Sequence, residues 1–294
     1  MRQVIFCFCA ALLLAACAKD EVIHEDLIID GNEPPDVTGV SSVAVNNYIN
    51  SLYIDLYGRT PTSDELSSAS GLLIAGDYDS LARLDVVQGL MNEWEYYKNI
   101  NLLTSQLYLV DVDSMSIQYQ IEYWEYLVDL FTDLGDPASA ALYAWELNRL
   151  YPLATAHVDL SNETIDMSEY LRIYLDNYYY DQVNMGSLNF VISCFVNLFH
   201  RYPTDDEEAS GVAMVDGATE QLFLMDGSSK GDFMDIMTTT PEFYQGLVIS
   251  AYTTFLARNP TAAEIDQHMQ ELIDSGDYNA LKKTILISEE YAGF

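Results

Sequence analysis

Basic residues are scarce in this sequence, and their scarcity narrows the classes of protein that it can be. Lys and Arg together number 12 among 294 residues, against 46 Asp and Glu, which gives a formal net charge of −34. A surface this acidic repels phosphate groups, so we expect neither nucleic acid nor an anionic lipid surface as a partner. Half of the residues are hydrophobic, so the chain should fold around a core instead of remaining a disordered acidic segment.

Cysteine and histidine are also few, and they form no metal-binding pattern. Three of the four cysteines fall within the first 17 residues, and there is no CxxC pair and no HExxH sequence. We therefore expect no disulfide framework, no metal site and no cofactor. The remaining Cys194 stands inside the apolar run FVISCFVNLF, which predicts a buried, unreactive thiol.

The N-terminus has the features of a secretory signal peptide. A short start containing Arg2 precedes an apolar run from Val4 to Leu14, which is too short to span a membrane as a helix. Residues 1–16 are therefore predicted to be a signal peptide. The stretch LAAC ending at Cys17 resembles a bacterial lipobox, and this resemblance implies cleavage before Cys17 and attachment of lipid to its thiol. The alternative is an ordinary signal peptide followed by a chance cysteine.

The residues after Cys17 bear on where the protein is delivered. Lys19, Asp20 and Glu21 resemble the surface-export signal of Bacteroidetes lipoproteins. That resemblance implies a lipid-anchored protein on the outer face of the bacterial outer membrane, with the periplasmic face as the alternative. Residues 17–42, which include GNEPPDVTG, are polar and rich in turn formers, and they are predicted to be a flexible tether.

One motif, aromatic-x5-Arg-x-Pro-Thr-x-x-Glu, occurs three times. Its members are Tyr53, Arg59, Pro61, Thr62 and Glu65 in the first copy; Phe195, Arg201, Pro203, Thr204 and Glu207 in the second; and Tyr252, Arg258, Pro260, Thr261 and Glu264 in the third. The proline ends one helix, and Thr-x-x-Glu is the signature of a capping box that starts the next. The motif therefore predicts a structural joint between helices. We expect its arginine to bind helix carbonyls or an acid of its own unit, with ligand binding as the alternative.

Two shorter signatures follow each joint. A Gly-Asp pair at Gly76, Gly231 and Gly276 is predicted to close one helix and cap the next. A Glu-aromatic pair then closes each unit, at Glu95, Glu242 and Glu290. Each repeat is thus predicted to contain three helices.

The repeats are similar to uncharacterised helical repeat domains of bacterial secreted and surface proteins. The resemblance covers residues 46–97 and 187–294, and it implies a helical fold without an established reaction. The second copy departs from the pattern by an insertion, MVDGATEQLFLMDGSSK, at residues 214–230. This insertion is where we expect any adaptation to a partner.

The segment between the first and second copies also has helical periodicity. Helices are predicted over SIQYQIEYWEYLVDLFTDLG, from Asp136 to a stop at Pro152, and over residues 165–186 with a cap at Asp166 or Ser168. No segment alternates as a strand does. We therefore predict an all-α array of ten to twelve helices, divided into a region at 43–185 with the first copy and a region at 186–294 with the other two.

Three further patterns suggest chemistry but have simpler interpretations. The sequence GSSKG matches a nucleophile elbow centred on Ser229, but the predicted loop between helices is not the setting that an elbow requires. DVDSMSIQYQIE resembles a calcium loop that lacks the glycine and one acid, so a helix cap at Asp113 is expected instead. Tyr178, Tyr179 and Tyr180 could stack on sugar rings, whereas tyrosines at helical spacing are more often core residues.

These observations together predict a surface-tethered, all-α lipoprotein that acts as a binding or assembly component and not as an enzyme. Its expected partners are the membrane, through lipid on Cys17, and either a protein or a glycan. One alternative is a glycan-binding accessory protein of a nutrient-uptake system. Another is a hydrolase whose site the sequence does not reveal. Whether the acidic surface binds Ca²⁺ or reflects a saline habitat is left open by the sequence.

Overall fold

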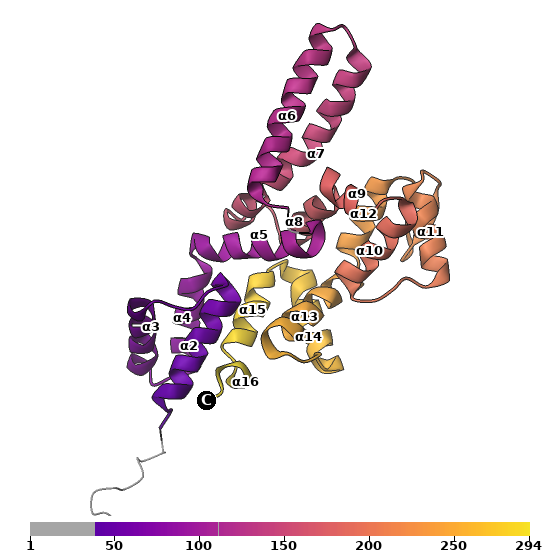
Figure 1. Cartoon of the computed structure of the whole chain (residues 1–294). Coiled ribbons are helices and arrows are strands. Elements are labelled where there is room, and N and C mark those ends of the chain that lie inside the picture. Colours follow the sequence, from indigo (N-terminus) through magenta and orange to yellow (C-terminus); the bar gives the residue numbers. More distant parts are fainter. Residues whose placement is uncertain (1–38, 111) are drawn as a thin grey trace, which may run out of the picture. The chain divides into compact units, whose positions relative to one another are not determined.

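The structure is a computed structural model that describes residues 39–110 and 112–294 (Figure 1). The predicted signal peptide, Cys17, the Lys19-Asp20-Glu21 signal and nearly all of the tether lie outside the described residues. None of the described helices is both long enough and apolar enough to cross a membrane.

The described part contains fifteen helices and one short β-hairpin, so the predicted all-α fold is confirmed. In chain order the elements are α2 (Ser42–Tyr57), α3 (Ser63–Ala75), α4 (Ser80–Met91), α5 (Trp94–Leu109), α6 (Ser114–Asp133), α7 (Pro137–Ser161), α8 (Met167–Leu175), α9 (Tyr178–Val183), α10 (Ser187–Phe199), α11 (Asp205–Val215), β1 (Glu220–Leu222), β2 (Met225–Gly227), α12 (Lys230–Thr239), α13 (Pro241–Leu256), α14 (Ala262–Ser275), α15 (Tyr278–Leu286) and α16 (Glu289–Ala292). The predicted number of ten to twelve helices was too low.

The three repeat copies appear as helix triplets that are each closed by a fourth helix. The first copy is α2, α3 and α4, and its Glu95 lies in the first turn of α5. The second is α10, α11 and α12, and its Glu242 lies in the first turn of α13. The third is α13, α14 and α15, and its Glu290 lies in α16. Because α13 closes the second copy and opens the third, these two copies share a helix.

The predicted Gly-Asp turn is correct in the third copy, correct in the first only in that Gly76 ends α3, and wrong in the second. In the third copy the side chain of Asp277 caps α15 as expected. In the first copy Asp77 itself takes a left-handed conformation, with a φ of 52°, and the cap moves to Asp79. In the second copy Ser229 caps α12, and Asp232 lies inside the first turn.

The insertion of the second copy folds as a β-hairpin, which the sequence did not predict. Strands β1 and β2 pair antiparallel, with Leu222 opposite Met225. The two turn residues, Phe223 and Leu224, have φ values of 50° and 64°, the left-handed geometry of a tight hairpin turn. Tight turns of this type usually carry Asn or Gly, and neither residue stands at these two positions. Leu222 is buried, so the hairpin is attached to the core.

Helices α6 and α7 pack against each other as a pair (Figure 1). The expected Asp-Pro start of α7 is present, because the side chain of Asp136 accepts a hydrogen bond from the Ser139 amide. The predicted stop at Pro152 is wrong, since α7 continues through this residue to Ser161. Proline removes one backbone hydrogen bond, but the buried Leu150 and Leu153 on either side hold both halves of α7 in the core.

The helix predicted over residues 165–186 is broken into α8 and α9 at Asn177. Its buried side chain accepts a hydrogen bond from the Tyr180 amide and donates one to the Tyr174 carbonyl. The same residue thus ends one helix and caps the next. Of the two caps proposed for α8, Asp166 is the one that forms.

The first and third copies pack directly on each other. The Tyr48 hydroxyl donates to the Leu286 carbonyl at 3.1 Å, and the Tyr291 hydroxyl donates to Asp55 at 2.7 Å. The ring of Phe294 packs edge-on against that of Tyr48. Residues far apart in the sequence therefore build one hydrophobic cluster. Residues Val40–Phe294 form one compact unit.

Gly246 of α13 lies at a very close approach to the end of α10. A Cβ atom at this position would lie 1.9 Å from the carbonyl oxygen of Leu198. We expect Gly246→Ala to lower the free energy of unfolding by about 1–3 kcal/mol, as overpacking does. Urea denaturation measures the change. The control is Gly89→Ala in α4, where a Cβ meets nothing within 4 Å and a gain of about 0.5–1 kcal/mol is expected. Equal behaviour of both variants would contradict the close approach.

Candidate functional site

Each repeat copy holds its motif arginine between two glutamates, an arrangement we call the Arg clamp. In the second copy Arg201 donates to both carboxylate oxygens of Glu207, each at 2.7 Å. It also donates to both oxygens of Glu242, at 2.5 and 2.8 Å. The first clamp joins Arg59 to Glu65 and Glu95, and the third joins Arg258 to Glu264 and Glu290. Pairing of the arginine with an acid, one of the two structural roles expected, is therefore confirmed.

The aromatic residue six positions before each arginine lies under its guanidinium. The distances from the guanidinium carbon to the ring centroid are 5.5 Å for Arg59 and Tyr53, 5.1 Å for Arg201 and Phe195, and 5.0 Å for Arg258 and Tyr252. These are cation–π distances. The residue before each arginine is left-handed, with φ of 72°, 58° and 51° at Gly58, His200 and Ala257. This conformation ends the helix and turns the chain into the clamp.

The motif glutamate has two roles. In the second copy Glu207 accepts from the Thr204 amide, and its own amide donates to the Thr204 hydroxyl. The predicted capping box is present in all three copies. Hydrogen bonds from Arg201 lower the pKa of Glu207 to about 2, so this carboxylate stays charged well into the acid range.

The second glutamate of each clamp is the residue that sequence reasoning missed. Glu95, Glu242 and Glu290 were noted as a repeated closing pair but were not connected to the arginine. Their recurrence at the same place in each unit was the available signal. The four charge-assisted donors of each arginine are thus directed at carboxylates of its own chain, which leaves the guanidinium little capacity for a ligand.

The three tyrosines proposed as glycan contacts differ in their surroundings. Tyr180 is completely buried, so its ring offers no surface to a sugar, and this part of the hypothesis is wrong. Its hydroxyl accepts a hydrogen bond from Asn197. Tyr178 and Tyr179 are half-buried, and the Tyr179 hydroxyl donates to the Ser116 carbonyl. For these two residues glycan contact stays a prediction.

The other candidate positions have structural roles. Ser229 accepts from the Asp232 amide as the cap of α12, and Asp113 accepts from the Ser116 amide as the cap of α6. Cys194 is fully buried as predicted, and burial raises the pKa of its thiol to about 12. Within the described ranges, no cluster of three or more His, Cys, Asp or Glu side chains is placed to bind a metal ion.

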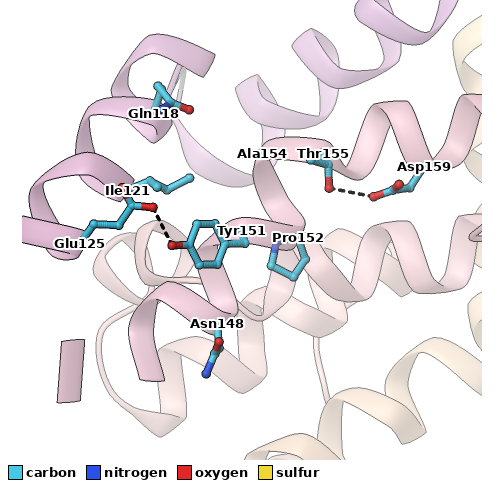
Figure 2. A pocket seen from close by; sticks show the side chains of 9 residues that line it. All are labelled: Gln118, Ile121, Glu125, Asn148, Tyr151, Pro152, Ala154, Thr155 and Asp159. Atoms are coloured by element: carbon cyan, nitrogen blue, oxygen red, sulfur yellow. Dashed lines mark hydrogen bonds between the residues drawn. The ribbon is translucent and has the colours of Figure 1, made fainter. Parts of the chain in front are cut away.

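An open groove runs between α6 and α7 (Figure 2). Its volume is about 630 Å³, and the Tyr151 hydroxyl donates to Glu125 across it at 2.7 Å. Gln118 and Asn148 add amide groups, and Pro152 forms part of the α7 side. The groove is therefore rich in hydrogen-bonding groups that can be reached from solvent.

The side of α6 opposite its core side carries a group of exposed aromatic residues, and we call it the α6 aromatic face. It consists of Met115, Tyr119, Tyr123 and Tyr126, which are 81, 70, 47 and 59% exposed. Their spacing places them on one side of the helix. The rings of Tyr119 and Tyr123 are nearly parallel, with 4° between their planes and 6.5 Å between their centroids. Exposed apolar groups gathered in this way are typical of a recognition surface.

A second hollow, the Lys282 cavity, lies among helices of the repeats and α5. Its volume is about 380 Å³, and it is lined by residues of α2, α5, α8, α10, α13 and α15, among them Leu, Phe, Ile and Met side chains. Lys282 is 6% exposed and lines this cavity. Its amine donates to the Tyr96 hydroxyl at 3.0 Å. Burial lowers the pKa of this amine to about 7.

Comparisons with known proteins do not identify a relative. No protein-family model matches the chain, and neither a curated protein nor a solved structure is similar to it.

The Arg clamps make a measurable prediction about stability. Arg201→Lys keeps the charge but loses the planar fork that serves two carboxylates, so we expect the free energy of unfolding to fall by about 1–2 kcal/mol. The matched variant Arg258→Lys should lose less stability than Arg201→Lys, because its partner Glu290 is 49% exposed and better screened by solvent. Urea denaturation measures both changes. An Arg201→Lys variant as stable as the parent would show that the second clamp is not a stabilising joint.

Proposed function

We propose that this protein is a lipid-anchored component of the bacterial outer membrane, exposed at the cell surface, that binds a protein partner and has no catalytic role. The anchor is lipid on Cys17 within LAAC, and the direction to the surface comes from Lys19, Asp20 and Glu21. The binding role rests on the described part of the chain.

The observation that carries the proposal is the α6 aromatic face. The other side of α6 places Ile117, Ile121 and Trp124 in the core against its neighbours. A helix that is already anchored by one apolar side has no folding reason to expose a second. A partner that covered Tyr119, Tyr123 and Tyr126 would remove this surface from water, and tyrosines are often the residues that dominate binding energy at interfaces.

The structural role of the repeated motif supports the proposal that the protein has no catalytic role. Its arginines and glutamates form ion pairs with one another inside each clamp, and its threonines cap helices. A reactive group needs a free pair of electrons or a donor directed at a substrate. The motif that looks most like a site therefore supplies a joint.

A glycan is the second candidate for the occupant of this surface. The parallel rings of Tyr119 and Tyr123 offer flat apolar faces, and the groove between α6 and α7 offers the carboxylate of Glu125 and the amides of Gln118 and Asn148. Rings of sugars present the matching combination of apolar faces and hydroxyl groups. This would make the protein a glycan-binding accessory of a nutrient-uptake system.

Replacing the tyrosines of the α6 aromatic face tests the binding role. The tagged chain carrying Tyr119→Ser, Tyr123→Ser and Tyr126→Ser should recover its partner at a level reduced on the order of tenfold or more, because the aromatic contacts are lost. The measurement is a pull-down from the native cells in gentle detergent, quantified by mass spectrometry. Tyr202→Ser is the control, since Tyr202 is 74% exposed but lies outside α6.

A carbohydrate-binding screen distinguishes a protein partner from a glycan. It is run on the parent, the triple tyrosine variant and Tyr202→Ser. Loss of a protein partner only in the triple variant supports the protein assignment, and loss of a glycan signal only in that variant supports the second candidate. If the triple variant and Tyr202→Ser both behave as the parent in both assays, the α6 aromatic face is not the binding surface.

The anchor has its own test. Cys17→Ser removes the thiol that would carry lipid, so the protein should move from the membrane fraction to the soluble fraction on cell fractionation. Cys194→Ser, which changes a buried thiol, is the matched control and should leave the protein in the membrane fraction. Retention of the Cys17→Ser protein in the membrane would contradict the lipid anchor.

A further inference from the structure

We propose that the Lys282 cavity is a binding site for a small amphipathic carboxylate, a molecule with one acidic head and an apolar body. This site is separate from the α6 aromatic face and does not depend on the function proposed for it. The inference rests on the composition of the cavity, the surroundings of its one buried amine and the position of its mouth.

The cavity has the composition of a small-molecule pocket. About 380 Å³ lies within the range of ligand sites in proteins. Most of the lining is apolar, and it includes Leu171 of α8, Leu198 of α10, Phe243 and Leu247 of α13. A few polar groups occur among them, as is usual where the orientation of a ligand is fixed. An apolar molecule that entered would exchange water for this lining.

Lys282 is the cationic group of the cavity, and its surroundings leave it without a counter-ion. In the part of the chain that the structure describes, no carboxylate lies within 4.0 Å of its amine, although the sequence has 46 acids. The ring centroids of Tyr278 and Tyr96 lie 4.5 and 5.3 Å from the amine. Aromatic rings at these distances attract a cation, but they carry no negative charge that would balance it. Burial disfavours the charged form of this amine, and an anion that entered would stabilise that form.

The hydrogen bonds of Lys282 point to a carboxylate as that anion. An ammonium has three N–H donors, and one of them is directed to the Tyr96 hydroxyl, which itself donates to Asn279. Two donors thus have no partner among the described residues, and a carboxylate has two oxygens to accept them. Tyr96 cannot be the anion, because burial raises the pKa of its hydroxyl well above the usual value.

The carboxylate and the imidazole of the lining are already engaged. The carboxylate of Asp55 accepts from Tyr291, and the ring nitrogen Nε2 of His200 donates to the Gly246 carbonyl at 3.2 Å. Burial lowers the pKa of His200, so its ring is neutral at pH 7. Lys282 is therefore the group in the lining that would select the charge of the ligand.

Two leucines of α5 mark the mouth of the cavity. Leu103 and Leu107 belong to the lining and are also 51 and 63% exposed. Side chains that contribute both to a cavity and to the surface lie at its opening. The apolar body of a ligand can therefore enter along α5.

The test compares decanoate with decanol, which has the same chain without the charge. The lipidated protein in lipid nanodiscs is titrated with each compound labelled with carbon-13 at C1, and bound signals are separated from those of empty nanodiscs. We expect saturable binding of decanoate. In Lys282→Met, which keeps an apolar side chain of similar length, the affinity for decanoate should fall on the order of tenfold or more, while that for decanol should stay unchanged.

A second pair of variants keeps the test independent of the lysine. Leu103→Trp narrows the mouth and should lower the affinity for both compounds. Leu102 is about equally exposed on α5 but lies outside the lining, so Leu102→Trp should leave both affinities unchanged. Circular dichroism verifies that each variant is folded. The proposal is overturned if decanoate does not saturate a site in the parent, if Lys282→Met weakens both compounds equally, or if the two tryptophan variants behave alike.

Discussion

The bidentate attraction between one arginine and two glutamates fixes how the helices of each repeat meet. Arg201 follows the left-handed residue that ends α10, Glu207 lies in the first turn of α11, and Glu242 lies in the first turn of α13. One guanidinium therefore sets the positions of three helix ends. Because the clamps are partly exposed, solvent screens them, and each contributes only modest free energy. Their main effect is geometric: two planar forks permit one arrangement of the three chain segments.

The rest of the packing follows from that arrangement. Once α13 closes the second copy, it also opens the third, and the third copy brings Leu286 and Phe294 against Tyr48 of the first. A similar arrangement appears outside the repeats, where the partly buried Arg149 of α7 pairs with Asp176 and Asp181. The insertion joins this second network, since Lys230 also pairs with Asp181. The chain has only 12 Lys and Arg residues. The clamp arginines, Arg149 and Lys230 all form their ion pairs where helices meet.

Local signals explain what could be predicted from the sequence. Thr204 and Glu207 form a capping box within four residues, so their spacing alone identifies it, and the all-α fold follows from helical periodicity. Partners distant in sequence were not predictable in this way. Arg201 and Glu242 are 41 residues apart, and nothing local shows that they meet. Burial of Tyr180 and continuation of α7 through Pro152 likewise depend on packing against other helices, which outweighs the local preference.

The Lys282 cavity and the α6 aromatic face are formed by different parts of the chain. The Lys282 cavity exists because helices of all three repeats meet α5 and α8 without filling the space between them. The α6 aromatic face, in contrast, belongs to a helix pair outside the three repeats. None of the clamp residues lies in α6 or α7, so the joints do not explain why α6 carries exposed Tyr119 and Tyr126. We propose recognition as the reason for the α6 aromatic face, whereas the cavity follows from the packing of the scaffold, and a ligand is proposed there because its lysine has no counter-ion among the described residues.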